Sequence, residues 1–105
     1  YLIGFAGKKV PVAPYATFGT EDLARSVADG IADGNAVLLA NHGLVAVGID
    51  LASAFACAEE IELVARIYYQ CRCAGTPQLI DDAEMDRVIG KFKSYGKSDP
   101  RSESP

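Results

Sequence analysis

The sequence is poor in the residues that most often build metal and redox sites. It contains a single histidine, His42, and three cysteines, an odd number with no C-x-x-C spacing. Because this pattern is not a disulfide framework, it favours free thiols in a reducing compartment. A zinc site of His42 with Cys71 and Cys73 is less favoured, since a C-x-C pair on a helix directs its thiols to faces about 200° apart.

Membrane spans, signal peptides and an excess of positive charge are also missing. No segment approaches the roughly 20 apolar residues that cross a bilayer. Residues 1–4 carry neither the basic start nor the cleavage pattern of a signal peptide. Acidic residues outnumber basic ones by 14 to 10, and the net charge of −4 argues against nucleic acid as a partner. These absences predict a cytoplasmic protein with no membrane partner.

The residues that are present suit one globular domain. Half of the 105 residues are hydrophobic and 23% are charged, which is typical of a packed domain in water. The first residue is Tyr1 and the only methionine is Met85, so we expect the chain to be part of a longer product. Residues 1–96 are predicted to form the domain, and residues 97–105, which are polar and charged, are predicted to be a disordered tail.

Local signals predict a mixed α/β or α+β fold. Two prolines, Pro11 and Pro14, impose an extended path, and Thr20 followed by two acidic residues is typical of a helix start. Short apolar runs between turn residues predict buried strands, and Asp81 with Glu84 resembles a capping box. The expected elements are strands at residues 1–3, 36–40 and 44–48, an extended segment at 10–15, and helices at 21–32, 51–74 and 81–92.

The predicted helix over residues 51–74 has more apolar surface than one core face needs. Its expected inner stripe follows helical spacing, whereas Leu63, Ile67 and Tyr69 lie outside that stripe. A second contact, with missing sequence or with another subunit, is therefore expected. The stripe consists of Leu51, Ala54, Phe55, Ala58, Ile61, Val64, Ala65, Tyr68 and Cys71.

The single histidine is the chain's only candidate for imidazole chemistry. His42 lies in the tripeptide Asn41-His42-Gly43 between two apolar runs, which predicts a tight hairpin with Gly43 at positive φ. A side chain at such a break points out of the end of the sheet, where sites are usually built. Taken alone, a histidine beside a glycine is more often a structural hydrogen-bonding group than a ligand.

Three motifs in series resemble one family, the class II aldolases typified by L-fuculose-phosphate aldolase. They are PVAPYATFGT at residues 11–20, LLANHGL at residues 38–44 and KFKSYG at residues 91–96. The resemblance implies a three-layer fold, in which a central, mainly antiparallel sheet lies between helices. It also implies a homotetramer with its sites at the subunit interfaces.

The resemblance also implies roles for four residues. His42 corresponds to the third histidine ligand of a catalytic Zn²⁺ site, which holds about three imidazoles and keeps one position open. Tyr1 corresponds to a catalytic tyrosine supplied by a neighbouring subunit, and Tyr95 to a C-terminal tyrosine that reaches into the adjacent subunit's site. Phe18 corresponds to an aromatic residue of the aldehyde pocket, with core packing as the equal alternative.

The activity implied is reversible aldol cleavage of a ketose 1-phosphate, such as L-fuculose 1-phosphate, to dihydroxyacetone phosphate and an aldehyde. A pentulose-phosphate 4-epimerase and a decarboxylating or dehydratase relative are alternatives within the family. A non-catalytic oligomerisation module like the adducin head is an alternative from another class, and a fragment that binds nothing is a third.

Part of the family's site has no counterpart in the sequence. The His-x-His pair that supplies the other two zinc ligands, the glutamate base and the phosphate-binding loop are all expected upstream of Tyr1. The chain is therefore expected to be the C-terminal half of such an enzyme, with the missing N-terminal half as its partner.

Overall fold

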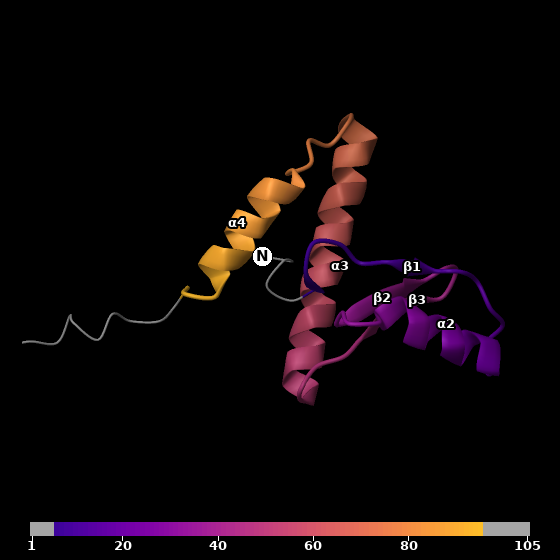
Figure 1. Ribbon diagram of the computed structural model, residues 1–105. Coiled ribbons are helices and arrows are strands. Elements are labelled where there is room, and N and C mark those ends of the chain that lie inside the picture. Colours follow the sequence, from indigo (N-terminus) through magenta and orange to yellow (C-terminus); the bar gives the residue numbers. More distant parts are fainter. Residues whose placement is uncertain (1–5, 96–105) are drawn as a thin grey trace, which may run out of the picture.

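The computed structural model describes residues 6–95, in which a small sheet is flanked by helices (Figure 1). This arrangement confirms the expected fold class. The strand predicted at residues 1–3 and the tail predicted at 97–105 lie outside the described residues. The elements are β1 (Val12–Ala13), α2 (Glu21–Ile31), β2 (Ala36–Leu39), β3 (Gly43–Ala46), α3 (Leu51–Ala74) and α4 (Asp82–Phe92).

The sheet is mixed, with β2 in its centre. β1 runs parallel to β2, and β3 runs antiparallel to it. Pro11 and Pro14 flank β1 and limit it to two residues, because proline has no N–H to donate to a ladder. The carbonyl groups of Pro11 and Ala13 nevertheless accept hydrogen bonds from β2, at 2.9 and 3.2 Å. The expected extended segment therefore forms an edge strand.

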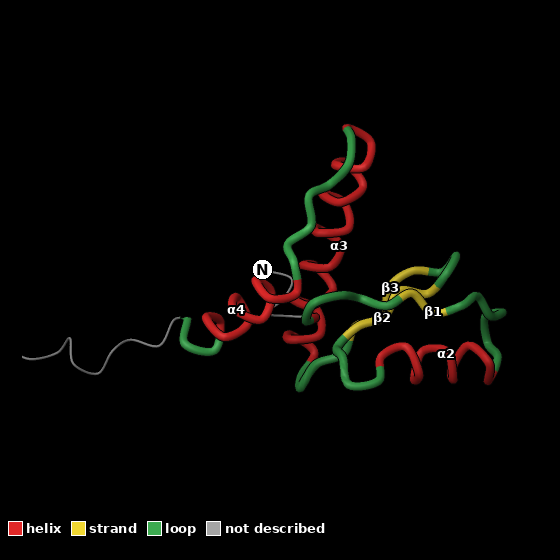
Figure 2. The backbone as a smooth tube through the Cα atoms, turned by 45° about the horizontal axis from the view of Figure 1, so that its top comes forward, coloured by secondary structure: helices red, strands yellow, loops and turns green. Residues whose placement is uncertain are grey.

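The two faces of the sheet are covered by different helices. Because successive strand residues point to opposite faces, Val37 and Ala13 lie against Gly30 of α2, whereas Ala36 packs with Cys57 and Ile61 of α3. Figure 2 shows the two helices with the sheet between them. Val37 is 0% exposed, and α2 approaches it at Gly30, where a Cβ would lie 2.5 Å from a Val37 methyl. The result is three layers of helix, sheet and helix.

The helix starts follow the sequence signals closely. Thr20, Asp50 and Asp81 are the N-caps of α2, α3 and α4, and each side chain accepts a hydrogen bond from the backbone N–H three residues later. Such caps satisfy donors that a helix start leaves unpaired. The hydrogen bonds from Ser53 hold the pKa of the Asp50 carboxyl below its usual value.

The predicted inner stripe of α3 is confirmed only in its middle, where Ile61 is buried and Ala54, Ala58 and Val64 are half-buried. The structure buries Cys57 and Ile61 against Ala36, and burial raises the pKa of the Cys57 thiol. Leu51, Phe55, Tyr68 and Cys71, which were expected inside, are all exposed. Tyr68 and Cys71 lie beyond the segment around Cys57 and Ile61 that packs against the sheet.

The fourth helix lies on the far side of α3 from the sheet (Figures 1 and 2). An ion pair of 2.8 Å between Lys8 and Asp86 connects it to the segment that precedes β1. The hydrogen bond to Asp86 raises the pKa of Lys8. A groove of about 780 Å³ remains beside α4, and its lining includes Val64, Ile67 and Leu79.

Candidate functional site at the β2–β3 turn

The candidate site is centred on the tight turn that joins β2 to β3. The backbone N–H of His42 donates to the carbonyl of Leu39 at 3.0 Å, which closes the predicted hairpin. Gly43 has φ 153°, as expected in sign, and Asn41 has φ 63°. Asn41 is thus the left-handed residue of the turn, a conformation that asparagine tolerates better than most side chains.

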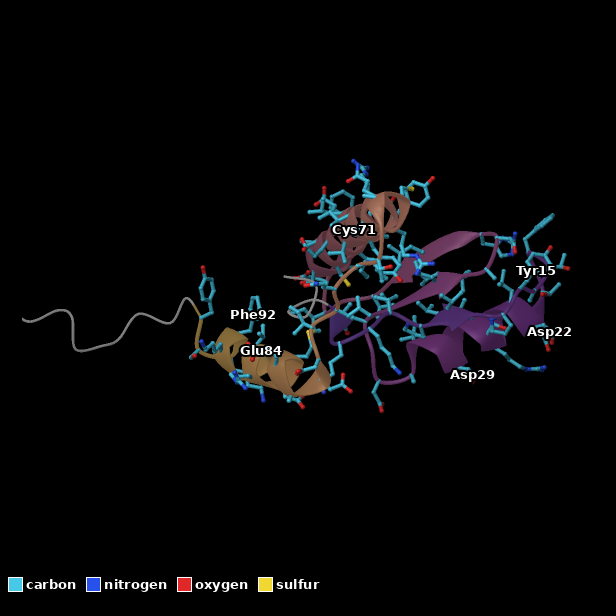
Figure 3. All side chains as sticks on the ribbon, turned by 90° about the horizontal axis from the view of Figure 1, so that it is seen from above. Tyr15, Asp22, Asp29, Cys71, Glu84 and Phe92 are labelled. Atoms are coloured by element: carbon cyan, nitrogen blue, oxygen red, sulfur yellow. The ribbon has the colours of Figure 1, made fainter. Side chains whose placement is uncertain are left out.

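The segment after β1 lies directly beside this turn. The parallel register pairs Ala13 with Leu39, and the N–H of Ala40 donates to the carbonyl of Ala13 at 3.2 Å. The next residues, Tyr15 and Ala16, therefore reach the level of His42. Figure 3 shows Tyr15 at this end of the molecule.

Two contacts orient the imidazole of His42. Its Nε2 lies 2.7 Å from the carbonyl oxygen of Ala16, and its ring stacks on Tyr15 with centroids 5.3 Å apart and planes 13° apart. Because a carbonyl can only accept, Nε2 must carry the proton in this arrangement. In the neutral ring, Nδ1 then keeps the free lone pair, which can bind a metal ion or accept a proton.

The chemistry of this donor suits one ligand of a metal site. Metal-binding histidines commonly donate their second ring N–H to a backbone carbonyl, as His42 does to Ala16. Among residues 6–95, however, no group of three or more His, Cys, Asp or Glu side chains could hold an ion. The thiols of Cys71 and Cys73 are free and exposed near the end of α3. A complete zinc site would need ligands from outside this part of the chain.

Phe18 lies in the loop that leads from Tyr15 to α2. Its side chain is 79% exposed, so the alternative of core packing does not hold. Gly19, with φ 72°, and the hydrogen bond from the Thr20 hydroxyl to the Thr17 carbonyl shape this loop. The apolar ring is available to a molecule outside the chain.

The two predicted tyrosines are not brought to His42 within the part of the chain that is described. Tyr95 is 74% exposed, and its ring packs at 6.0 Å on Phe92. Figure 3 places Phe92 at the opposite end of the molecule from Tyr15. Tyr1 lies outside the described residues.

Sequence reasoning missed the two residues that touch the imidazole. Tyr15 and Ala16 belong to the PVAPYATFGT motif, but their contacts with His42 arise from strand pairing across 26 residues. A parallel pairing of residues 12–13 with residues 38–39 would have placed them beside the turn. Among residues 6–95, no helix combines the length and the apolar character that crossing a membrane requires.

Comparisons with known proteins give consistent matches. A family model for the class II aldolase and adducin N-terminal domain matches residues 2–69. The chain is 50% identical over 97 residues to 5-deoxy-D-ribulose 1-phosphate aldolase of Bacillus thuringiensis serovar kurstaki, which covers 92% of this chain and 46% of that protein. It is 40% identical over 98 residues to L-fuculose phosphate aldolase of Escherichia coli K12, covering 91% and 46%.

A solved structure extends the match to three dimensions. An L-fuculose 1-phosphate aldolase superposes with a TM-score of 0.82 at 44% identity, covering 88% of this chain and 43% of that one. The chain thus spans less than half the length of the relatives that it matches.

Proposed function

The chain belongs to the class II aldolase and adducin family, and on that premise we propose that it is part of an aldolase acting on a ketose 1-phosphate. The reaction proposed is reversible cleavage to dihydroxyacetone phosphate and an aldehyde. The names of the relatives support this class, since they are aldolases of 5-deoxy-D-ribulose 1-phosphate and L-fuculose phosphate. The higher identity to the former makes a 5-deoxypentulose phosphate the first substrate to test, and L-fuculose 1-phosphate the second.

The observation that carries the proposal is the orientation of His42. Its Nε2 lies 2.7 Å from the Ala16 carbonyl, an acceptor, so in the neutral ring the lone pair of Nδ1 is available at the exposed end of the sheet. We propose Zn²⁺ as the cofactor, with His42 as one ligand and the others supplied by the rest of the protein. When bound, zinc would supply an electrophile that stabilises negative charge on the substrate oxygens.

The proposed cleavage breaks the bond between C3 and C4 of the ketose. The C4 hydroxyl loses its proton and becomes the aldehyde, while the electron pair of the broken bond passes to the C3 fragment, which then takes up a proton. In the reverse direction a tyrosine is a suitable acid for the aldehyde oxygen. Tyr1 and Tyr95 are proposed as catalytic residues donated to a neighbouring subunit's site, and Phe18 as a wall of the aldehyde pocket.

These roles presuppose an assembly, which we propose to be a homotetramer in the cytoplasm. The exposure of Tyr95 and Phe18 supports the idea that both side chains serve a surface other than the core of their own chain. The missing half of the protein would provide the phosphate-binding groups and the carboxylate base.

A chimeric enzyme tests the proposal directly. This chain would replace the matching 97 residues of the B. thuringiensis relative, whose remaining sequence supplies the rest of the site. We expect the chimera to bind about one zinc per chain and to cleave 5-deoxyribulose 1-phosphate. The variant His42→Ala should lose both properties, and full zinc occupancy in that variant would refute the assignment.

The matched control is His42→Gln. Its amide can still donate to the Ala16 carbonyl but is a poor zinc ligand, so it separates support of the turn from metal binding. It should fold like the parent chimera and bind zinc as poorly as His42→Ala. Epimerisation of a pentulose phosphate without cleavage would favour the epimerase alternative, and assembly without zinc or activity would favour the adducin-like module.

A further inference from the structure

The Tyr15 side chain stacks on His42 although most of its surface is exposed. It is 59% exposed, yet its ring lies nearly parallel to that of His42, with planes 13° apart and centroids 5.3 Å apart. His42 is itself exposed, so the core does not fix its ring. The imidazole is held by the Tyr15 face and by the Ala16 carbonyl.

We propose that Tyr15 is a positioning residue that stacks on His42 and keeps its imidazole in the Nε2–H tautomer. A neutral imidazole in water exchanges its proton between two nitrogens and rotates about its bond to Cβ. The Ala16 carbonyl stabilises only the Nε2–H tautomer, because its oxygen accepts a hydrogen bond from an N–H and repels a nitrogen lone pair. The stack restricts the ring to the plane in which this hydrogen bond forms.

The backbone explains why Tyr15 can do this. Pro14 restricts the residue before it to an extended conformation, and the pairing of Ala13 with Leu39 fixes how far the chain has advanced along β2. Tyr15 and Ala16 then follow directly, so the stacking ring and the accepting carbonyl come from adjacent residues. The orientation of His42 by these two residues therefore depends on strand register rather than on burial.

The consequence for metal binding rests on the proposed function. Partners that orient a metal-binding histidine fix its tautomer before the ion arrives, and their loss commonly costs 10-fold or more in affinity. Tyr15 would thus raise the zinc affinity of the assembled site without touching the ion.

The single histidine makes the tautomer directly measurable. In the 105-residue chain labelled with ¹⁵N-histidine, only His42 contributes ring nitrogen signals. In the neutral ring we expect one protonated and one unprotonated nitrogen, with Nε2 carrying the proton. Tyr15→Ala should move both signals towards the average of the two tautomers, whereas Tyr15→Phe, which keeps the ring, should resemble the parent chain.

Tyr69→Ala is the matched control, since it also removes an exposed tyrosine, from α3. It should leave the His42 signals unchanged. In the chimera, Tyr15→Ala should weaken zinc binding about 10-fold and Tyr15→Phe should not. Parent-like signals and zinc affinity in Tyr15→Ala would overturn the proposal, as would equal losses in Tyr15→Phe.

The two measurements separate this inference from the proposed function. A parent chimera that binds no zinc would contradict the aldolase proposal, whereas the nitrogen signals of the metal-free chain still report whether Tyr15 orients the ring. A fixed tautomer in the parent that is lost in Tyr15→Ala supports the positioning role on its own.

Discussion

The sheet region and the region formed by α4 and the C-terminal half of α3 differ in how far their apolar side chains are buried. The sheet region contains the buried core, in which Val37 is 0% exposed, although apolar side chains at its edges such as Val12 are exposed. Around the C-terminal half of α3 and α4, large apolar side chains remain in water, and Leu79 is 78% exposed. Both regions are rich in apolar residues, but among the described residues only the sheet region encloses fully buried ones.

The sheet region therefore forms its core within this chain, whereas the α3–α4 region leaves apolar surface without a cover from this chain. α2 and the N-terminal half of α3 enclose the sheet, whereas the groove beside α4 keeps Ile67, Ile80 and Val88 along an open surface. Extended apolar surfaces of this kind commonly mark contacts with another chain or segment. The sheet region should therefore respond to core mutations, and the α3–α4 region to mutations that affect assembly.

The largest effect is expected from a truncation in the sheet core. Val37→Ala should lower the stability by about 2 kcal/mol, because it removes buried methyl groups and leaves a cavity. The melting temperature should fall by roughly 10 °C. Leu79→Ala is the control from the open region and should shift the melting temperature little. Equal losses would show that the two regions are equally packed.

Two helix glycines provide a sharper contrast. Gly30→Ala places a Cβ 2.5 Å from a methyl of the stiff, buried Val37, so α2 must shift. Overpacking costs about 1–3 kcal/mol, which exceeds the gain of ~1 kcal/mol from replacing glycine in a helix. Gly90→Ala in α4 meets no atom within 4 Å and should gain up to ~1 kcal/mol. Chemical denaturation measures both, and the same sign for both would contradict the comparison.

A charge in the open region should affect assembly more than folding. Ile67→Lys changes a half-exposed side chain, so its effect on the free energy of unfolding should be small, within about 0.5 kcal/mol. In the chimera it should shift sedimentation towards smaller species, because a buried unpaired lysine is costly. Ala28→Lys adds the same charge to the exposed side of α2 and should leave the assembly intact. Unchanged sedimentation of Ile67→Lys would exclude this face as a subunit contact.

The smallest effect concerns the start of α3, which belongs to the sheet region. Asp50 has a lowered pKa in the folded chain because Ser53 donates hydrogen bonds to its carboxylate. Its contribution to stability is therefore complete above its ordinary pKa of 3.8 and is lost as the pH falls through the lower folded value. Asp50→Asn can cap the helix without titrating, so its stability, followed by circular dichroism, should fall less steeply in this acidic range. A slope identical to that of the parent would contradict this.

The features of the fold that depend on residues close together in the sequence were predictable. Caps such as Thr20 and Asp81, and the end of α3 at Gly75, are local signals, and each lies where it was expected. The buried face of α3 was predictable only in part, because its extent depends on how far the short strands run along the helix. Ile61 is buried as expected, whereas Cys57 is buried and Phe55 exposed against expectation.

The candidate site divides in the same way. The turn around His42 was predictable because a glycine and two apolar runs define it. The contacts of His42 with Tyr15 and Ala16 were not, because they need a parallel pairing with a strand of two residues. The roles of Tyr1, Phe18 and Tyr95 stay predictions, since each requires groups beyond a single copy of this chain.

The two prolines beside β1 also determine the direction in which the sheet can grow. Between Pro11 and Pro14, the outer side of β1 offers a new strand the backbone groups of Val12 but no N–H from either proline. The outer side of β3 carries no such block, because Leu44 and Ala46 alternate with the residues that pair with β2. A strand added beside β1 would meet one backbone donor, at Val12, whereas a strand added beside β3 would meet two, at Leu44 and Ala46. Among the described residues, the β3 edge is therefore the better template for a further strand.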